Sequence, residues 1–325
     1  MKQLLFFIML IPFFVQSQIY KKSEPFTHTY SIVALDEETG EMGVAVQSHW
    51  FSVGSLVIYG EAGVGVVATQ SLVNPSYGPK GLALMKQGLA PQQALEALLM
   101  NDEGQAYRQV AMLNKDGLTA THTGKLCIDE AGHKRGKNYS VQANMMLKNT
   151  VWDAMARAFE NTSGKLEHRL MAALKAAERE QGDIRGQQSA AILIVNPTAT
   201  GNSWQDVKME LRVEDSENPI EELERLIKVH EAYDFMNKGD MAMEAGNSQE
   251  AETMYLNAQN LFPENIEMQY WYAINLLNNK DFDKAEPILK SIFEKDNNWK
   301  TLTSRLLKSK ILTISSETLK KVLDL

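Results

Sequence analysis

The chain of 325 residues contains one cysteine, Cys127, and this scarcity excludes several kinds of site. A single thiol forms no intramolecular disulfide and offers no cysteine pair to zinc. The six histidines include no His-Glu-x-x-His motif, so we expect neither a metal nor another cofactor. A lone cysteine is more often a small core residue than a nucleophile, and we interpret Cys127 in that way.

Positive charge is also scarce, because 33 Lys and Arg residues stand against 41 Asp and Glu residues, a net charge of −8. Nucleic acids and anionic lipid surfaces both need a positive footprint, so neither is an expected partner. Hydrophobic residues make up 44% of the chain and charged residues 23%, the usual balance of a globular protein. The length leaves room for two domains, each with its own core.

Long apolar runs are rare, and the one that matters is Leu4–Val15. It follows a charged start, and a small-residue cleavage site ends at Ser17, which is typical of a signal peptide over residues 1–17. Such a run is too short to cross a bilayer as a helix, so we expect no permanent membrane anchor. We therefore expect an exported protein, periplasmic or extracellular, that begins near Gln18 with a short segment, residues 18–28.

Beyond the leader, Thr29–Leu35 and Met42–Ser48 are β-branched runs on either side of a loop that contains glycine. This pattern predicts a hairpin. Symmetric pairing about the loop places Thr29 opposite Ser48, with both side chains on one face. Two hydroxyls at the open end of a buried hairpin form either a site or a pair of ordinary edge-strand hydroxyls, and the spacing allows both.

Further runs up to about residue 215 predict one unit of strands and helices. Ala62–Gln70 is a small, β-branched run like the hairpin strands. Helical patterns lie between groups of strands, which predicts the α+β class with sheets covered by helices in layers. The other expected helices are Leu82–Met100, with a start signal at Ala90, Val151–Asn161 and Leu166–Arg179, and the other expected strands are Tyr107–Leu113, Leu118–His122, Tyr139–Met146, Ser189–Val195 and Val207–Val213.

Two common functional motifs are misplaced or absent. The segment from Gly63 to Ala68 matches a dinucleotide-binding fingerprint, but it lies inside a β-branched run and no helix follows. We interpret its glycines as permitting a close backbone approach within a sheet. The chain has no Gly-x-Ser-x-Gly motif, which leaves a Ser-His-Asp hydrolase without its nucleophile.

From about Pro219 onward, helical patterns replace the β-type runs, and one pattern repeats. Ala251-Glu252 recurs as Ala285-Glu286, a spacing of 34 residues. This period resembles tetratricopeptide repeats, which are helix pairs, and predicts an all-α domain over residues 229–325 that docks a protein or peptide. Two copies are fewer than the usual three, so we expect support from a helix at Pro219–Val229 or from the first domain. An unrelated helical bundle is the alternative.

Polar residues at the edges of the apolar runs are candidates for a site, because loops at strand ends carry function. Asp183 and Arg185 lie together in a turn-like segment, where they either belong to a site or simply pair with each other. The segments concerned are Ser48-His49, Thr69-Gln70, Asn74–Pro79, Gln142–Asn144 and Asp183–Ser189.

Seven blocks of the chain, in this order, are Thr29–Ala34, Gly43–Gly54, Ala62–Gly65, Ala68–Gln70, Asn74–Pro79, Tyr139–Met146 and Gly182–Ser189. Together they resemble a bacterial and archaeal family catalogued as domain of unknown function 1028. The resemblance spans about residues 27–226 and implies an N-terminal-nucleophile (Ntn) hydrolase-like αββα sandwich, with two stacked sheets between helix layers. The family has no settled substrate, and a helical C-terminal extension is compatible with it.

The resemblance also implies a nucleophilic Thr, Ser or Cys at a free N-terminus, whose own α-amino group is the general base. Such an amine has a pKa of about 7.7–8.0, so it accepts a proton near neutral pH. Thr29 aligns with this nucleophile, which in many relatives follows the initiator Met directly. Here residues 18–28 still precede Thr29 after signal cleavage, and an amide nitrogen cannot be the base.

Three functions are compatible with the sequence. In the first, a cut between His28 and Thr29 frees Thr29 as the nucleophile of an exported amidohydrolase. Ser48 and His49 then orient the site, and backbone N–H groups with Asn144 or Gln70 stabilise the oxyanion.

In the second, the protein is a catalytically inactive binding module for a small polar or anionic molecule, and its repeats dock a protein. In the third, it is a structural component of an envelope assembly that uses only the repeats. A homo-oligomer is left open in each case. The expected ligand-binding residues of the second function are Thr69, Gln70, Asn74, Tyr77, Asp183 and Arg185.

Overall fold

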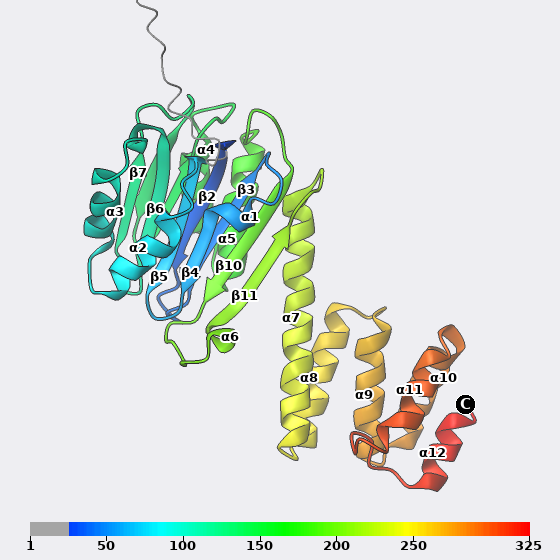
Figure 1. Cartoon of the computed structure of the whole chain (residues 1–325). Coiled ribbons are helices and arrows are strands. Elements are labelled where there is room, and N and C mark those ends of the chain that lie inside the picture. The colour runs from blue at the N-terminus through cyan, green and yellow to red at the C-terminus, as the bar shows by residue number, and fades with distance from the viewer. Residues whose placement is uncertain (1–25) are drawn as a thin grey trace, which may run out of the picture. The chain divides into compact units, whose positions relative to one another are not determined.

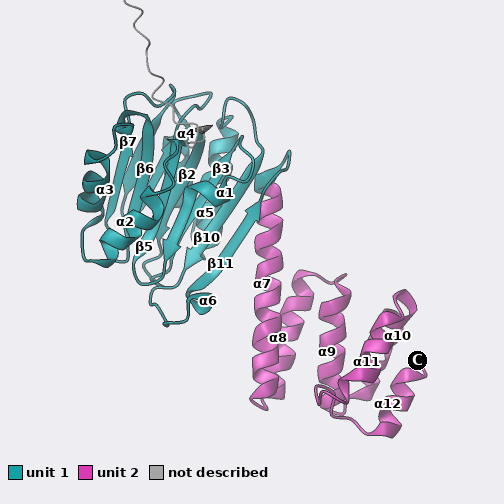
Figure 2. Cartoon of the chain, viewed as in Figure 1, with its two compact units in different colours: residues 1–220 teal, residues 221–325 magenta. Residues whose placement is uncertain are grey.

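The computed structural model describes residues 26–325, so the signal peptide expected over residues 1–17 lies outside the described part. The chain divides into two compact units, one ending at Ile220 and the other running from Glu221 to Leu325 (Figure 2). Within residues 26–325, no helix is long and apolar enough to cross a membrane.

The first unit is built on two antiparallel sheets (Figure 1). One sheet contains β1 (Phe26–Thr27), β4 (Ile58–Glu61), β5 (Gly65–Leu72), β6 (Arg108–Asn114) and β7 (Thr119–Thr123). The other contains β2 (Thr29–Leu35), β3 (Met42–Ser48), β8 (Gly132–Gly136), β9 (Tyr139–Ala143), β10 (Ser189–Val195) and β11 (Val207–Val213). Their orders are β1-β5-β6-β7, with β4 also on β5, and β11-β10-β3-β2-β9-β8.

β2 and β3 form the predicted hairpin, and their register pairs Thr29 with Ser48 as symmetric pairing requires. Asp36 begins the loop, where its side chain accepts the backbone N–H groups of Glu38 and Thr39 at 2.9 and 3.1 Å. Gly40 has a φ of +74°, a left-handed conformation that glycine adopts without strain. The loop therefore fixes the register, and the register brings the two hydroxyl residues together at the open end.

Helices cover the outer face of each sheet (Figure 1). α2 (Tyr77–Lys86) and α3 (Pro91–Met100) pack on the sheet that contains β5 and β6. α4 (Val151–Asn161) and α5 (Leu166–Arg179) pack on the sheet that contains β2 and β9. Aliphatic side chains from both sheets meet in the middle and exclude water. The order helix, sheet, sheet, helix confirms the predicted α+β class and αββα sandwich.

The bounds of α4, α5, β10 and β11 coincide with the predicted ranges. The helical region predicted for Leu82–Met100 is two helices, because Gly88 has a φ of +97° and Pro91 opens α3 at the predicted start. β4 and β8 were not predicted, since both are short and lack alternating apolar residues. The remaining short elements are α1 (Gly54–Val57), a 3-10 turn (Gln105–Tyr107) and α6 (Ser203–Asp206).

Cys127 lies in the core of the first unit, as its interpretation from the sequence requires. Its side chain is buried, and its Sγ donates to the carbonyl oxygen of Arg108 at 3.4 Å. Burial raises the pKa of the thiol, so the reactive thiolate is disfavoured. A role as nucleophile therefore has no support.

The second unit consists of helices whose neighbours pack pairwise: α8 on α9, α9 on α10, α10 on α11 and α11 on α12. Ala251 and Ala285, the residues that repeat in the sequence, are both fully buried, which lets neighbouring helices approach closely. The helix predicted at Pro219–Val229 continues to Glu244. The helices are α7 (Pro219–Glu244), α8 (Ser248–Leu261), α9 (Ile266–Asn278), α10 (Phe282–Lys295), α11 (Asn298–Leu306) and α12 (Ser316–Leu323).

Candidate active site

The space between the two sheets is polar at the end where β2 begins. Along each strand, alternate side chains point into this space, and the inward residues near this end carry hydroxyl or amide groups. All of them are fully buried: Thr29 and Ser31 of β2, Ser48 of β3, Gln70 of β5, Gln109 of β6 and Gln142 of β9. A buried polar group is costly unless it has a hydrogen-bond partner, so their partners decide what this region does.

The inward amides and hydroxyls bond to one another across the two sheets. Ser31 Oγ donates to Gln70 Oε1 at 2.6 Å and accepts from Gln142 Nε2 at 2.6 Å. Gln70 Nε2 donates to Gln109 Oε1 at 2.7 Å and to the carbonyl oxygen of Thr29 at 3.1 Å. The first residue of β2 is thus held by a side chain from the opposite sheet.

Gln109 sets the direction of these hydrogen bonds. Its Nε2 has two backbone carbonyl oxygens among its acceptors, so this atom must be the N–H donor and its Oε1 must be the acceptor. That oxygen accepts from Gln70 and, at 2.9 Å, from Asn144 Nδ2. The acceptors of Gln109 Nε2 are Thr123 Oγ1 (2.9 Å), the carbonyl of Gly132 (3.2 Å) and the carbonyl of Ala143 (2.9 Å).

The orientation of the Asn144 amide in turn determines which ring nitrogen of His28 carries the proton. Because Asn144 Nδ2 donates to Gln109, its Oδ1 is the atom that faces His28 Nδ1, at 2.9 Å. The Nδ1 atom of His28 therefore carries the proton in this contact. Burial lowers the pKa of His28, against the hydrogen bond to Asn144, and the guanidinium of Arg185 lowers it further, so the ring is neutral at pH 7.

The peptide bond between His28 and Thr29 is enclosed, with His28 only 4% exposed and Thr29 fully buried. The carbonyl oxygen of His28 accepts from Ser48 Oγ at 2.5 Å and from Arg185 Nη2 at 3.1 Å. The carbonyl oxygen of Thr29 instead accepts the backbone N–H of Asn144 at 3.1 Å, beside the bond from Gln70. Two donors, one of them charged, thus polarise the carbonyl group directly before Thr29.

Asp183 positions this arginine. Arg185 donates Nη2 and Nε to the two carboxylate oxygens of Asp183 at 2.7 and 3.0 Å, while Nη2 also reaches the carbonyl of His28. Asp183 and Arg185 therefore meet both expectations: they bond to each other, and they also lie at the Thr29 end. The backbone N–H of His49 donates to Asp183 at 3.3 Å. His49 Nδ1 is buried without a hydrogen-bond partner among residues 26–325.

Asn144 and Gln70, expected from the sequence to stabilise an oxyanion, contact a different carbonyl oxygen from Ser48 and Arg185. Asn144 and Gln70 donate to the carbonyl oxygen of Thr29 itself, which is not an oxygen that becomes an oxyanion when Thr29 attacks. The donors on the preceding carbonyl are Ser48 and Arg185. The structure thus places Ser48 and Arg185 on the carbonyl oxygen of His28, and Asn144 and Gln70 on that of Thr29, while the oxyanion role expected for Asn144 or Gln70 stays a prediction.

The other expected ligand-binding residues lie elsewhere in the first unit. The side chain of Thr69 points to the opposite face of β5 from that of Gln70, and its Oγ1 donates to the carbonyl of Asn74 at 3.3 Å. Asn74 and Tyr77 line a cavity of about 630 Å³ together with Asp102. Tyr77 donates to Asp102 at 3.0 Å, and burial together with this carboxylate raises the pKa of the phenol. The expected ligand-binding residues therefore lie in two places, the Thr29 end and the cavity beside Asn74 and Tyr77.

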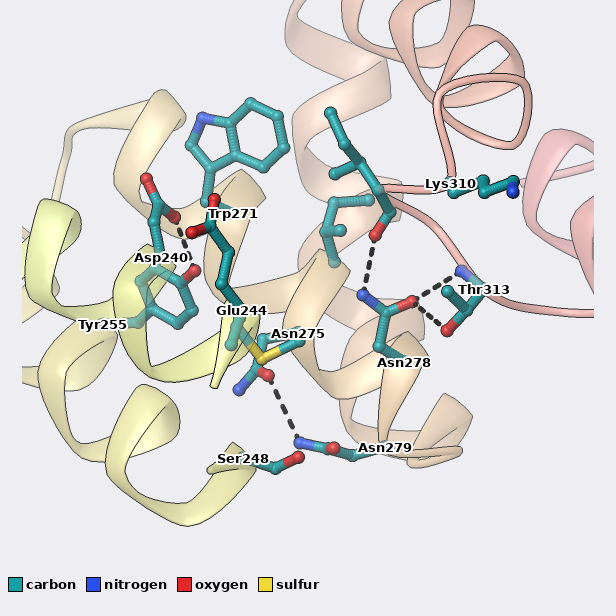
Figure 3. A pocket seen from close by; sticks show the side chains of 13 residues that line it. Asp240, Glu244, Ser248, Tyr255, Trp271, Asn275, Asn278, Asn279, Lys310 and Thr313 are labelled. Atoms are coloured by element: carbon teal, nitrogen blue, oxygen red, sulfur yellow. Dashed lines mark hydrogen bonds between the residues drawn. The ribbon is translucent and has the colours of Figure 1, made fainter. Parts of the chain in front are cut away.

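The second unit has a cavity of its own, of about 580 Å³, lined by residues of α7, α8, α9 and the segment after α11 (Figure 3). Asn278 holds one wall, because its Nδ2 donates to the carbonyl of Ile311 at 2.9 Å and its Oδ1 accepts the N–H of Thr313 at 2.8 Å. On the other side Tyr255 donates to Asp240 at 2.7 Å. Within residues 26–325, no group of three or more His, Cys, Asp or Glu side chains has an arrangement suited to a metal ion.

Three residues of the Thr29 end were not singled out from the sequence. Ser31 and Gln109 stand inside predicted strands on the same face as the apolar inward residues Val33 and Ala111, a signal that something polar lies between the sheets. His28 belongs to the segment before the first domain and carried no signal.

The four layers place the first unit in the class of proteins that have two stacked sheets between helix layers, and Thr29 is enclosed between the sheets. The family model described as "Family of unknown function (DUF1028)" matches residues 29–223, and the chain belongs to this family. A tetratricopeptide repeat model matches residues 242–306. Repeats of this kind commonly form surfaces that bind other proteins, so the match suggests protein interaction through the second unit.

Two solved structures are similar to the chain. Protein SPO2555 from Silicibacter pomeroyi, described as DUF1028, is 33% identical with a TM-score of 0.57, and the match covers 62% of this chain and 85% of that one. Anbu (ancestral beta-subunit) from Yersinia bercovieri is 11% identical with a TM-score of 0.31, over 62% of this chain and 96% of that one, too distant to support an argument. None of the curated proteins matches the chain.

Proposed function

We propose that the chain is the precursor of an amide hydrolase whose nucleophile, Thr29, is released by a cut between His28 and Thr29. The observation that supports this function best is the hydrogen bonding of the His28 carbonyl. Its oxygen accepts from Ser48 at 2.5 Å and from Arg185 at 3.1 Å, inside a closed site. Donors fixed on a carbonyl oxygen before any charge develops are what acyl transfer requires.

The proposed cut is intramolecular. Thr29 Oγ1 attacks the carbonyl carbon of His28, and the resulting five-membered ring carries an oxyanion that Ser48 and Arg185 stabilise. The C–N bond then breaks, the hydroxyl proton passes to the departing nitrogen, and His28 is left as an ester on Thr29 Oγ1. Water hydrolyses this ester, giving the His28 carboxylate and a Thr29 with free hydroxyl and α-amino groups.

Burial argues for an intramolecular cut over an external protease. Proteases need an exposed, flexible segment, whereas His28 is 4% exposed and Thr29 fully buried. Phe26 and Thr27 are also paired with β5, opposite Leu72 and Ser71. The attacking hydroxyl, in contrast, belongs to the residue next to the bond, so no protease has to reach it.

After the cut, the same groups serve a substrate. The α-amino group of Thr29 takes the proton from its own hydroxyl, which attacks the amide carbonyl of the substrate. Ser48 and Arg185 then stabilise the new oxyanion, typically about 2.7–4 kcal/mol for each donor. Gln70 and Asn144 keep Thr29 in place through its carbonyl oxygen. An amine leaves, and water hydrolyses the acyl ester.

Export and protein docking complete the proposed function. The composition of residues 1–17 supports a signal peptide, which directs the protein to the periplasm or the exterior. The helical repeats support docking of a protein or peptide by the second unit. The alternative is an inactive binding module that uses the cavity beside Asn74 and Tyr77 for a small polar molecule.

The full chain, unfolded in denaturant and then refolded, tests the cut. Intact mass followed over hours should show loss of everything before Thr29, and Thr29→Ser should still cut because it keeps a hydroxyl. Thr29→Ala should stay whole while giving the same far-UV circular dichroism. A wild-type chain that folds and keeps its mass for days would contradict the proposal and leave the binding module.

A further inference from the structure

The structure indicates which acyl group the site accepts. In the proposed cut, the residue esterified to Thr29 Oγ1 is His28. A substrate passing through the same site forms the same ester with its own acyl group in place of His28. The space that now holds the His28 side chain is therefore the space that the acyl side chain of a substrate occupies.

We propose, building on the function proposed above, that the mature protein hydrolyses amide or peptide bonds on the carboxyl side of histidine or asparagine. The contact that carries this is between His28 Nδ1 and Asn144 Oδ1, at 2.9 Å. It calls for an N–H group bonded directly to Cγ of the acyl residue. Histidine has Nδ1 at this place and asparagine has Nδ2.

Asn144 cannot reverse its side chain to suit a different residue. Its Nδ2 donates to Gln109 Oε1 at 2.9 Å, and Gln109 is itself fixed by the carbonyl oxygens to which it donates. A reversed amide would set two oxygens against each other at that contact. Aspartate, which has only oxygens on Cγ, would meet Asn144 Oδ1 without a proton between them. Leucine would leave that buried oxygen unpartnered.

The charged groups nearby favour a neutral acyl side chain. Arg185 lies beside His28, and its guanidinium disfavours a second positive charge there. Asp183, the nearby carboxylate, already binds Arg185 through both oxygens. A lysine side chain in this space would therefore be a buried cation without a counter-ion.

The residues before His28 extend the inference from amides to peptides. Phe26 and Thr27 pair with Leu72 and Ser71 of β5, so the segment leaving the site is held as a short strand. A peptide substrate with two residues before its histidine or asparagine, in the places of Phe26 and Thr27, can form the same backbone hydrogen bonds.

The first experiment varies residue 28 in the full chain and measures the rate of the cut by intact mass after refolding. His28→Asn keeps an N–H on Cγ, whereas His28→Leu puts a methyl group there. We expect His28→Asn to cut within a few-fold of wild type and His28→Leu about tenfold or more slowly, because without the bond to Asn144 the carbonyl of residue 28 is no longer held in position for attack by Thr29 Oγ1. Both variants change a residue that leaves the protein, so neither alters the mature site.

The second experiment uses the cut protein and the probe acetyl-Phe-Thr-His-p-nitroanilide, with Asn, Leu or Asp in place of His. We expect kcat/KM for His and Asn to exceed that for Leu and Asp by about tenfold or more. A wild-type chain that cuts, with equal rates for Asn and Leu at residue 28 and equal turnover of all probes, would overturn this inference and leave the proposed function standing. A chain that never cuts would remove both.

Discussion

The two ends of the space between the sheets differ sharply, although the same strands build both. At one end the inward residues are apolar, such as Val33, Val66 and Leu113. At the other end the same alternation supplies Ser31 and Gln109, also fully buried. Apolar burial stabilises a fold by itself, while buried amides add little net stability and need partners.

The polar end of the core therefore serves to hold groups in fixed positions and adds little to the stability of the fold. Gln70 and Asn144 donate to the carbonyl oxygen of Thr29, and Gln109 accepts a hydrogen bond from each of them. A fully satisfied network restrains its members to one arrangement. The apolar end, by contrast, tolerates repacking as long as volume is kept. Mutations at the two ends should separate stability from chemistry.

The largest expected effect is at the apolar end. Leu113→Ala leaves a cavity between the sheets and should lower the free energy of unfolding by about 2–5 kcal/mol. Urea denaturation in a Thr29→Ala background measures this, with the exposed Leu118→Ala as control. The cut in an otherwise wild-type Leu113→Ala chain should proceed at nearly the normal rate below its unfolding temperature. If the activation free energy of the cut rose by as much as the free energy of unfolding fell, the two ends would not contribute independently to stability and chemistry.

Ser48→Ala should show the opposite behaviour. It removes one donor from the carbonyl of His28, so the cut should slow about 10²- to 10³-fold, the usual consequence of losing one oxyanion donor. Stability should fall by only about 1 kcal/mol, the value of an ordinary hydrogen bond. Intact mass over time and urea denaturation report the two quantities. The matched control is Ser55→Ala, which removes a hydroxyl from an exposed position.

Gln109→Leu tests the network itself. The donors Gln70 Nε2 and Asn144 Nδ2 lose their shared acceptor, which should cost about 1–3 kcal/mol of stability. The cut should also slow, because Asn144 is then free to turn. Gln92→Leu, the same change at an exposed helix position, should leave both quantities unchanged. A variant that gained stability and kept its rate would show that the amides serve no positioning role.

The smallest expected effect is on pH dependence. Burial lowers the pKa of His28 in the folded chain from its ordinary value of 6.5, so the unfolded chain binds more protons just below that pH. The contribution of neutral His28 is complete above about pH 6.5 and is lost as the pH falls through the folded pKa. Thr29→Ala should therefore lose stability at pH 5 relative to Thr29→Ala with His28→Asn. Urea midpoints that change by the same amount between pH 7.5 and pH 5 in the two chains would contradict this.

Much of the first unit was predictable from local patterns. Helices α4 and α5 have apolar residues at helical spacing, and the hairpin has its own loop chemistry, so their bounds follow from nearby residues. The relation between Gln70 and Gln109 was not predictable in this way, because it depends on which strands pair. The contact between His28 and Asn144 joins residues 116 positions apart. Strand ends marked where a site lies, and only the three-dimensional pairing shows which groups face the carbonyl.

The single buried thiol has a practical consequence for a protein expected outside the cytoplasm. With Cys127 enclosed and no second cysteine, folding needs neither an oxidant nor a disulfide isomerase. The thiol reacts only when the surrounding structure opens. Its alkylation rate is thus a built-in measure of local opening of the first unit, and a disulfide-linked dimer on a non-reducing gel would mark molecules that opened.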